Sequence, residues 1–206
     1  MTEPPRGRLI ALEGIDGCGK STQAAHLADA LGALATFEPG ATALGRALRL
    51  LLLDPERGAP SPRAEALLMA ADRAEHVEEV VRPAIDAGRW VVTDRYSGST
   101  LAYQGWGRGL PAEPLREMVG WAAGGIEPDL SVLVDVDPDV ARQRLAGARP
   151  DRLEALDPAF HARVRHGYVA LARADPGHWV VVDGTGPVHT VAQSVESAVA
   201  ARLGRP

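Results

Sequence analysis

Residues 9–31 hold the feature that most limits what this chain can fold into. An apolar run, LIAL, is typical of a buried strand, and a later stretch, STQAAHLADAL, is typical of an amphipathic helix. The loop between them fits the pattern G-x-x-x-x-G-K-[ST], with its fixed places taken by Gly14, Gly19, Lys20 and Ser21. Glycines let successive backbone N–H groups turn toward phosphate oxygens, and a helix start adds the positive end of its dipole. The stretch therefore predicts a strand, a phosphate-binding loop and a helix, in that order.

The polar residues of this loop have expected tasks. We expect Lys20 to reach the β- and γ-phosphates of a bound nucleoside triphosphate, and the Ser21 hydroxyl to take one position around Mg²⁺. The predicted triphosphate-binding residues of the loop are Gly14, Ile15, Asp16, Gly17, Cys18, Gly19, Lys20, Ser21 and Thr22.

Apolar, β-branched runs recur along the chain with helical patterns between them. The expected strands cover residues 9–12, 33–37, 90–93, 130–134 and 179–182. Strands that alternate with helices favour a parallel sheet covered on both faces. A length of 206 residues suits one domain with a substantial core. We therefore predict an α/β fold, a single domain over residues 1–206 with a five-stranded parallel sheet and helices on both faces.

Two of the helical patterns carry more detailed expectations. Residues 43–53 place leucines such as Leu44, Leu48 and Leu51 on one apolar stripe, with Arg46 and Arg49 off it, which is typical of an amphipathic helix. Residues 63–87 form a longer pattern that contains Pro83 near its end, and this proline predicts a kink or a break.

Polar residues follow every expected strand. They are Asp16, Glu38, Asp94, Asp135 and Asp183. Asp commonly begins a turn, so each residue alone is weak support for a site. Ligands of parallel α/β sheets bind beyond the carboxyl ends of the strands, and five such ends at one edge favour a site there. In that site Asp94 is placed to hold Mg²⁺, and the planar guanidinium of Arg95 suits a second phosphate.

Composition excludes several classes of partner and site. With 22 basic and 27 acidic residues, the formal charge of −5 predicts neither nucleic acid nor a membrane surface as a partner. One cysteine excludes an intrachain disulfide framework, and the six scattered histidines form no i, i+4 pair that would suggest a metal site. The first residues lack the apolar core of a signal peptide, so we expect a cytoplasmic protein.

The segment of about 142–155 is rich in arginine. Its arginines are Arg142, Arg144, Arg149 and Arg152, and Gly147 and Pro150 interrupt the helical pattern. One interpretation is an arginine-rich helix end with its side chains on different sides. The other is a mobile lid that delivers arginines over the γ-phosphate and excludes water.

Five motifs in order resemble one family. GIDGCGKSTQ, EPG, LLMAADR, DRYSGSTLAYQG and DRLEALDPAFHARVRHGY are similar to motifs of thymidylate kinase, which uses ATP to phosphorylate dTMP to dTDP. The resemblance runs from about residue 8 to residue 186, and DRY with the following S-T-x-A-Y-Q is its most specific part. The phosphate loop alone indicates only a kinase or NTPase.

The resemblance implies roles for residues on the acceptor side. It implies that Asp16 contacts the acceptor and Mg²⁺, and that Glu38 lies near the sugar. It implies that Arg73 reads the thymine carbonyl edge, that Arg95 grips the dTMP phosphate, and that Tyr103 crowds the sugar 2′ position. The full dTMP-binding set implied in this way is Asp16, Glu38, Met69, Arg73, Arg95, Thr100, Tyr103 and Gln104.

On the donor side the resemblance implies that Arg144 stacks on adenine, with the loop around Asp183 on the other side of the ring. The implied catalytic residues are Lys20, Asp16, Arg95 and Arg149, and the implied Mg²⁺ residues are Ser21, Asp94 and Asp16. Because relatives pair through helices, the resemblance also implies a homodimer.

The chain departs from the family pattern at three positions. Phe37 stands where many members have an arginine before the glutamate, and Met69 stands where an aromatic ring commonly covers thymine. Gly17 replaces a loop arginine of some relatives, so the missing charge must come from the lid, as in the bacterial style of the family. Arg149 is the first choice for that role, and Arg152 is the alternative.

Two other functions stay open at this point. A kinase for a deoxynucleoside or another monophosphate is one, although a nucleoside would leave Arg95 without an anion. A module that binds ATP without transferring phosphate is the other. The sequence also predicts that Cys18, beside a helix start, has a thiol of lowered pKa whose alkylation ATP·Mg²⁺ slows.

Overall fold

The centre of the molecule is a parallel sheet. Within residues 6–147 and 149–204, which the computed structural model describes, five strands form it, as the sequence predicts. They are β1 (Leu9–Glu13), β2 (Leu34–Phe37), β3 (Val91–Asp94), β4 (Leu130–Asp135) and β5 (Trp179–Asp183). Their order is β2-β3-β1-β4-β5, and every neighbouring pair is parallel. All five carboxyl ends therefore meet at one edge of the sheet.

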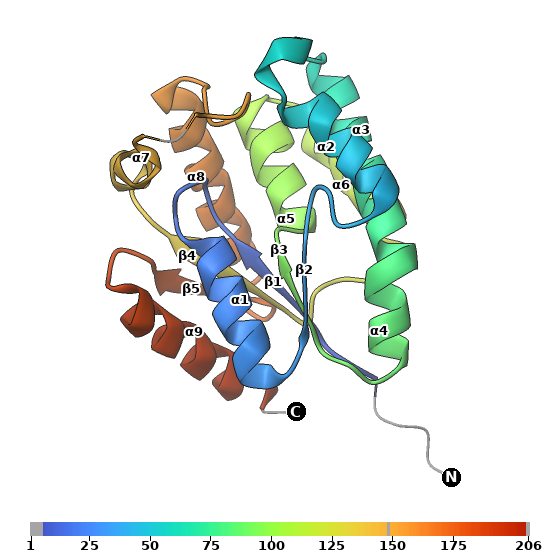
Figure 1. Ribbon diagram of the computed structural model, residues 1–206, viewed down its shortest axis with the longest axis vertical. Coiled ribbons are helices and arrows are strands. Elements are labelled where there is room, and N and C mark those ends of the chain that lie inside the picture. Colours follow the sequence, from blue (N-terminus) through green and yellow to red (C-terminus); the bar gives the residue numbers. More distant parts are fainter. Residues whose placement is uncertain (1–5, 148, 205–206) are drawn as a thin grey trace.

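Helices cover both faces of this sheet (Figure 1). The α-helices are α1 (Lys20–Leu31), α2 (Ala43–Leu53), α3 (Pro62–His76), α4 (Arg82–Asp86), α5 (Ser97–Thr100), α6 (Ala112–Ala122), α7 (Pro138–Leu145), α8 (Pro158–Ala174) and α9 (Val188–Leu203). Short 3₁₀ and π turns lie at Pro55–Arg57, Val77–Val81 and Leu101–Gly107. Every residue of β1 is buried, since both faces of a central strand are covered. Ile10 and Leu12 belong to the core that includes α1 and α9, whereas Leu9 and Ala11 pack with the α4 side.

The long helical pattern of residues 63–87 is interrupted, as Pro83 predicts. α3 ends at His76, a π turn occupies Val77–Val81, and α4 begins at Arg82. Proline lacks an N–H and its ring crowds the carbonyl four residues earlier, so the widened turn directly before it accommodates both effects.

The leucine stripe of α2 is buried along only half of its width. Leu48 and Leu52 are buried, but Leu44 and Leu51 are well exposed, together with Leu50. Only part of the stripe is covered, since α2 lies over α3 at the rim of the molecule and has one covered side.

The predicted lid of about 142–155 divides into unlike parts. α7 continues to Leu145, whereas Arg152 and Leu153 are buried in the body of the protein. Residues 146, 147, 149 and 150 are exposed and Asp151 is half-buried, while Ala148 lies outside the described part of the chain. An exposed arginine-bearing loop thus exists, but it is shorter than predicted.

Candidate active site

A cavity of about 510 Å³ opens at the edge where the strands end. Figure 1 shows α7 and α2 standing on opposite sides above this edge. Residues predicted for both substrates share its wall, namely Asp16, Lys20, Ser21, Glu38, Met69, Arg73, Asp94, Arg95, Thr100, Tyr103 and Gln104. The fold thus brings together residues that lie up to 88 positions apart in the chain.

The phosphate-binding loop has the backbone that its glycines predict. Gly14 and Gly19 have φ values of 146° and 96°, a region that residues with a side chain rarely adopt. α1 begins directly after Gly19, and no side chain caps its first N–H groups. A helix start of this kind is a ready anion site. The Lys20 ammonium is buried beside it, 3.3 Å from Asp16 Oδ1 and 3.5 Å from the Ile15 carbonyl oxygen.

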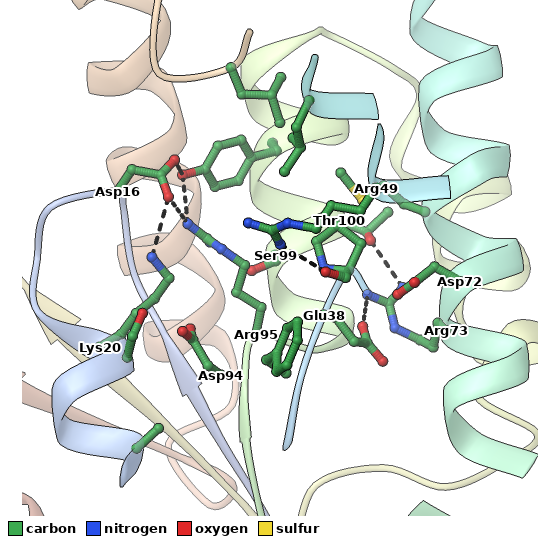
Figure 2. A pocket seen from close by; sticks show the side chains of 18 of the residues that line it. Asp16, Lys20, Glu38, Arg49, Asp72, Arg73, Asp94, Arg95, Ser99 and Thr100 are labelled. Atoms are coloured by element: carbon green, nitrogen blue, oxygen red, sulfur yellow. Dashed lines mark hydrogen bonds and ion pairs between the residues drawn. The ribbon is translucent and has the colours of Figure 1, made fainter. Parts of the chain in front are cut away.

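Asp16 lies between the two cations expected to meet the substrate phosphates (Figure 2). Its carboxylate forms ion pairs with Lys20 and Arg95, and it accepts a 2.7 Å hydrogen bond from the Tyr103 hydroxyl. Burial by itself would raise the pKa of Asp16, but the Arg95 guanidinium and then the Lys20 ammonium outweigh burial and hold it well below its usual range. Asp16 is therefore a fixed negative charge that both cations share.

Arg95 points into the cavity from the turn after β3. Its backbone has φ of 74°, and its N–H donates to the Leu12 carbonyl oxygen. Its Nη2 contacts Asp16 and, at 3.2 Å, the Tyr103 hydroxyl, while its Nη1 donates to oxygens of the protein interior. One edge of the guanidinium is thus anchored and the other faces the cavity, as a phosphate ligand requires.

The cavity wall also holds a pair of residues suited to Mg²⁺. Asp94 has a buried Oδ1 without a hydrogen-bond partner, and Ser21 lines the same cavity. Among the described residues no group of three His, Cys, Asp or Glu is arranged to bind a metal alone. Mg²⁺ in phosphate-transfer sites usually takes one or two protein oxygens and completes its shell with phosphates and water, so this pair fits. Asp16, the third predicted ligand, has its carboxylate engaged by Lys20, Arg95 and Tyr103.

On the opposite side of the cavity, Arg73 is held by a buried network. Its Nη1 donates to Thr100 Oγ1 at 3.0 Å, and its Nη2 donates to Glu38 Oε2 at 2.7 Å. Glu38 Oε1 lies 2.9 Å from His76 Nδ1, and His76 Nε2 lies 2.7 Å from Thr36 Oγ1. Glu38, which the resemblance places near the sugar, here serves as the counter-ion that fixes Arg73.

Gln104 also lines the cavity, but its amide nitrogen is hydrogen-bonded to another residue of the protein. It donates a 2.8 Å hydrogen bond to Glu65, a fully buried carboxylate that also binds Arg108 and Arg152. Gln104 thus supports the wall of the cavity from behind, whereas Met69 is part of the wall itself.

Neither lid arginine lines this cavity. Arg149 is on the outer surface with 76% of its side chain exposed, in a 2.8 Å ion pair with Glu56, which is equally exposed. Arg152 is 8% exposed and donates to Glu65 and to the Leu52 carbonyl oxygen, both at 2.6 Å. The structure therefore separates the two candidates into an exposed arginine and a buried one.

Arg144, which the resemblance implies stacks on adenine, lies in the last turn of α7. Its guanidinium donates to the carbonyl oxygens of Cys18 and Gly184, at 3.2 and 2.9 Å, and so joins the phosphate loop to the loop after β5. In that second loop Asp183 accepts hydrogen bonds from the N–H and hydroxyl of Thr185, which lower its pKa.

Comparisons with known proteins agree with this geometry. The family model described as thymidylate kinase matches residues 12–195. The chain belongs to the thymidylate kinase family. A thymidylate kinase of Synechococcus sp. (strain RCC307) is 48% identical over 205 residues, covering 94% of this chain and 96% of that protein. A thymidylate kinase of Leifsonia xyli subsp. xyli is 50% identical over 204 residues, with 96% of each covered.

A solved structure shares the fold of this thymidylate kinase family member. The crystal structure of thymidylate kinase from Ehrlichia chaffeensis matches it with a TM-score of 0.79 and 27% sequence identity, covering 95% of this chain and 99% of that one. The predicted α/β fold and the predicted family are both confirmed.

Sequence reasoning about this family member missed several residues of the cavity wall, among them Arg49 and Asp72. Arg49 of α2 lines the cavity, with its Nη1 held at 2.8 Å by the Pro39 carbonyl oxygen (Figure 2). It supplies a cation on the side where Phe37 replaces an arginine. Asp72 accepts a hydrogen bond from the Gly40 N–H, and burial, aided by nearby Glu38, raises its pKa to about 6. For Asp72 the available signal was its place in the LLMAADR motif, directly before Arg73.

The expectation for Cys18 was wrong. The residue is 1% exposed, and burial raises the pKa of its thiol despite the opposing charge of Lys20. A helix start lowers a thiol pKa only where the thiolate is solvated or paired, and this one is packed among apolar side chains.

We therefore predict that Cys18 in the folded protein reacts with a thiol reagent at least about 10²-fold more slowly than in the unfolded chain, because labelling must await a local opening. The rate of reaction with a chromogenic disulfide, with and without denaturant, checks this. Rates within tenfold of each other would contradict it.

Proposed function

We infer that this protein transfers the γ-phosphoryl group of ATP to dTMP, giving dTDP and ADP in the synthesis of dTTP. The observation that carries the inference is the placement of Lys20 and Arg95 on one cavity with Asp16 between them. One cation belongs to a triphosphate loop and the other faces a second anion, which is the arrangement a monophosphate kinase requires. Membership of the thymidylate kinase family indicates that the acceptor is dTMP.

The mechanism needs little covalent chemistry from the protein. The acceptor phosphate is the nucleophile and is already an anion at neutral pH, so no general base is required. Lys20 would hold the transferred group, and Arg95 and Arg49 would hold the acceptor phosphate, so that two polyanions can approach in line. An incoming acceptor phosphate would take over the Nη2 edge of Arg95 from Asp16.

We propose that Asp94, directly or through water, and Ser21 hold Mg²⁺ together with the phosphates. The ion would supply further neutralisation of charge on the transferred group. The buried, unpartnered Oδ1 of Asp94 supports this assignment.

The base would be read by Arg73. Its guanidinium is fixed by Glu38, Thr100 and the Tyr96 carbonyl oxygen, so it is pre-organised to meet a carbonyl group. Met69 would cover the ring face, and Tyr103 would restrict the sugar 2′ position.

Measurement of ADP release from ATP·Mg²⁺, with and without dTMP, tests the function. Release that depends on dTMP supports it. Equal release in both conditions would indicate an ATPase, faster release with thymidine would indicate a nucleoside kinase, and no release would indicate a module that only binds ATP.

We further propose that the protein is a cytoplasmic homodimer. The exposed leucines of α2, with Leu67 of α3, give these two packed helices an apolar outer face, and contiguous apolar surface of this kind favours a protein interface. No helix in the described ranges is long and apolar enough to cross a membrane. Sedimentation equilibrium should give twice the chain mass of 21.7 kDa, and the monomer mass at micromolar concentration would contradict the dimer.

A further inference from the structure

Glu13, the last residue of β1, is a carboxylate with no exposed surface. Its Oε1 accepts hydrogen bonds from the backbone N–H groups of Tyr96 and Ser99, at 3.0 and 3.1 Å. Its Oε2 accepts from the Ser99 hydroxyl at 2.6 Å and from the Tyr168 hydroxyl at 3.1 Å. A buried carboxylate that accepts four hydrogen bonds from two other segments organises those segments. Glu13 itself does not line the cavity, whereas Ser99 does.

The two hydroxyls that bind Glu13 also bind Arg95. Arg95 Nη1 donates to Ser99 Oγ at 3.0 Å and to Tyr168 Oη at 3.1 Å. A hydroxyl has one proton and two lone pairs. When that proton is directed at the Glu13 carboxylate, only lone pairs remain for the guanidinium. Glu13 thereby sets the polarity of two of the three acceptors that hold Nη1, the third being the Gly14 carbonyl oxygen at 3.1 Å.

Glu13 also fixes the backbone from which Arg95 emerges. Arg95 has the positive φ of 74°. Beyond it along the chain, the backbone N–H groups of Tyr96 and Ser99 both donate to Glu13. Positive φ is costly for a residue with a side chain and persists only where its surroundings hold it. The carboxylate therefore acts on Arg95 through both its main chain and its side chain.

We propose that Glu13 is the positioning residue of Arg95: through Ser99 and Tyr168 it locks one edge of the guanidinium into the interior and leaves the other edge directed at the acceptor phosphate. The proposal rests on the proposed role of Arg95 as the ligand of that phosphate. Glu13 touches no substrate itself.

The ionisation of Glu13 links this positioning to pH. Burial raises its pKa to about 7, against the hydrogen bond from Ser99 and the charge of Arg95. The charged or titratable groups that face it are Arg95 and Tyr96 after β3, Arg73 of α3 and Tyr168 of α8. Above pH 7 the carboxylate is ionised and accepts the Ser99 hydroxyl proton, while the Tyr168 hydroxyl donates to the carboxylate or to Ser99 Oγ, 2.7 Å away. Below pH 7 it carries a proton of its own, and one hydroxyl no longer needs to donate to it.

Glu13→Gln provides the test, because an amide N–H at the place of Oε2 would donate to the hydroxyls and turn their protons toward Arg95. Calorimetric dissociation constants for dTMP and for thymidine are measured with the full chain at pH 8.5 and pH 6. We expect the preference for dTMP over thymidine to fall about 10-fold at pH 8.5, the range for a hydrogen bond to a charged group. Thymidine affinity should stay within about twofold, since the base pocket is unchanged. At pH 6 the wild-type carboxyl is itself neutral, so the difference from wild type should shrink.

Three further variants make the result decisive. Tyr168→Phe removes one hydroxyl and should lower the preference for dTMP over thymidine about threefold. This variant tests the positioning role if Glu13→Gln does not fold. Glu65→Gln alters another buried carboxylate with several donors, and it should leave the preference unchanged. Arg95→Ala tests the underlying function: if it keeps the preference for dTMP, the phosphate assignment of Arg95 fails. If Arg95→Ala removes the preference while Glu13→Gln and Tyr168→Phe leave it intact at both pH values, the positioning role is overturned.

Discussion

Thymidine should be phosphorylated with a kcat/KM at least about 10⁴-fold below that of dTMP, since a site built to bind a polar group rejects an analogue that lacks it by this factor. Thymidine would leave Arg95 and Arg49, which both line the cavity, without their anion. Its 5′-hydroxyl would also need a general base. Asp16 is the carboxylate paired with both Arg95 and Lys20. Burial would raise its pKa, but Arg95 and Lys20 outweigh burial and hold the pKa well below the usual range. Asp16 is therefore a poor base.

The measurement is ADP formation with each acceptor under ATP·Mg²⁺. Arg95→Ala is the informative control, because it should lower kcat/KM for dTMP steeply while leaving the low value for thymidine almost unchanged. A thymidine rate within about 10²-fold of the dTMP rate would show that the phosphate of dTMP is not what the site recognises.

Arg149→Ala should lower kcat by about 10²-fold or more, with a smaller change in KM for dTMP, as expected for an arginine that stabilises charge mainly in the transition state. The structure favours Arg149 over Arg152 on energetic grounds. The Arg149–Glu56 ion pair is exposed, and such pairs are worth about 0–1 kcal/mol, so Arg149 can leave it when the loop closes. Arg152 is buried against Glu65, and breaking a buried pair costs several kcal/mol.

Arg152→Ala is the matched control, with the opposite expected profile. It should lower the free energy of unfolding by about 3 kcal/mol, near the lower end for a broken buried pair because Arg108 still binds Glu65. Denaturant unfolding and steady-state kinetics on both variants separate the two roles. The assignment fails if Arg152→Ala shows the large loss in kcat and Arg149→Ala does not.

The fold and the phosphate loop could be predicted because their signals are local. Buried parallel strands appear in a sequence as short apolar runs, and the helices between them show the helical spacing of apolar residues. Both patterns involve residues close together in the chain, so they predict the sheet. The geometry of the loop depends on glycines at fixed spacing, and Gly14 and Gly19 adopt the positive φ that the motif requires. The order of the motifs then indicated the family, which the comparisons confirmed.

Tertiary structure alone decided which charge meets which. Glu38 lines the cavity, and α3 brings Arg73 and His76 to its carboxylate across 35 and 38 residues. Arg149 and Arg152 are three positions apart and look alike in sequence, yet one is exposed and the other is anchored to Glu65, 87 residues away. Cys18 lies beside a helix start, but its surroundings remove the solvation that a thiolate needs. The burial of a side chain and its ionic partners depend on every element packed around it. Sequence spacing therefore determined which residues are available to the site. The packing of the helices determined what each of those residues does.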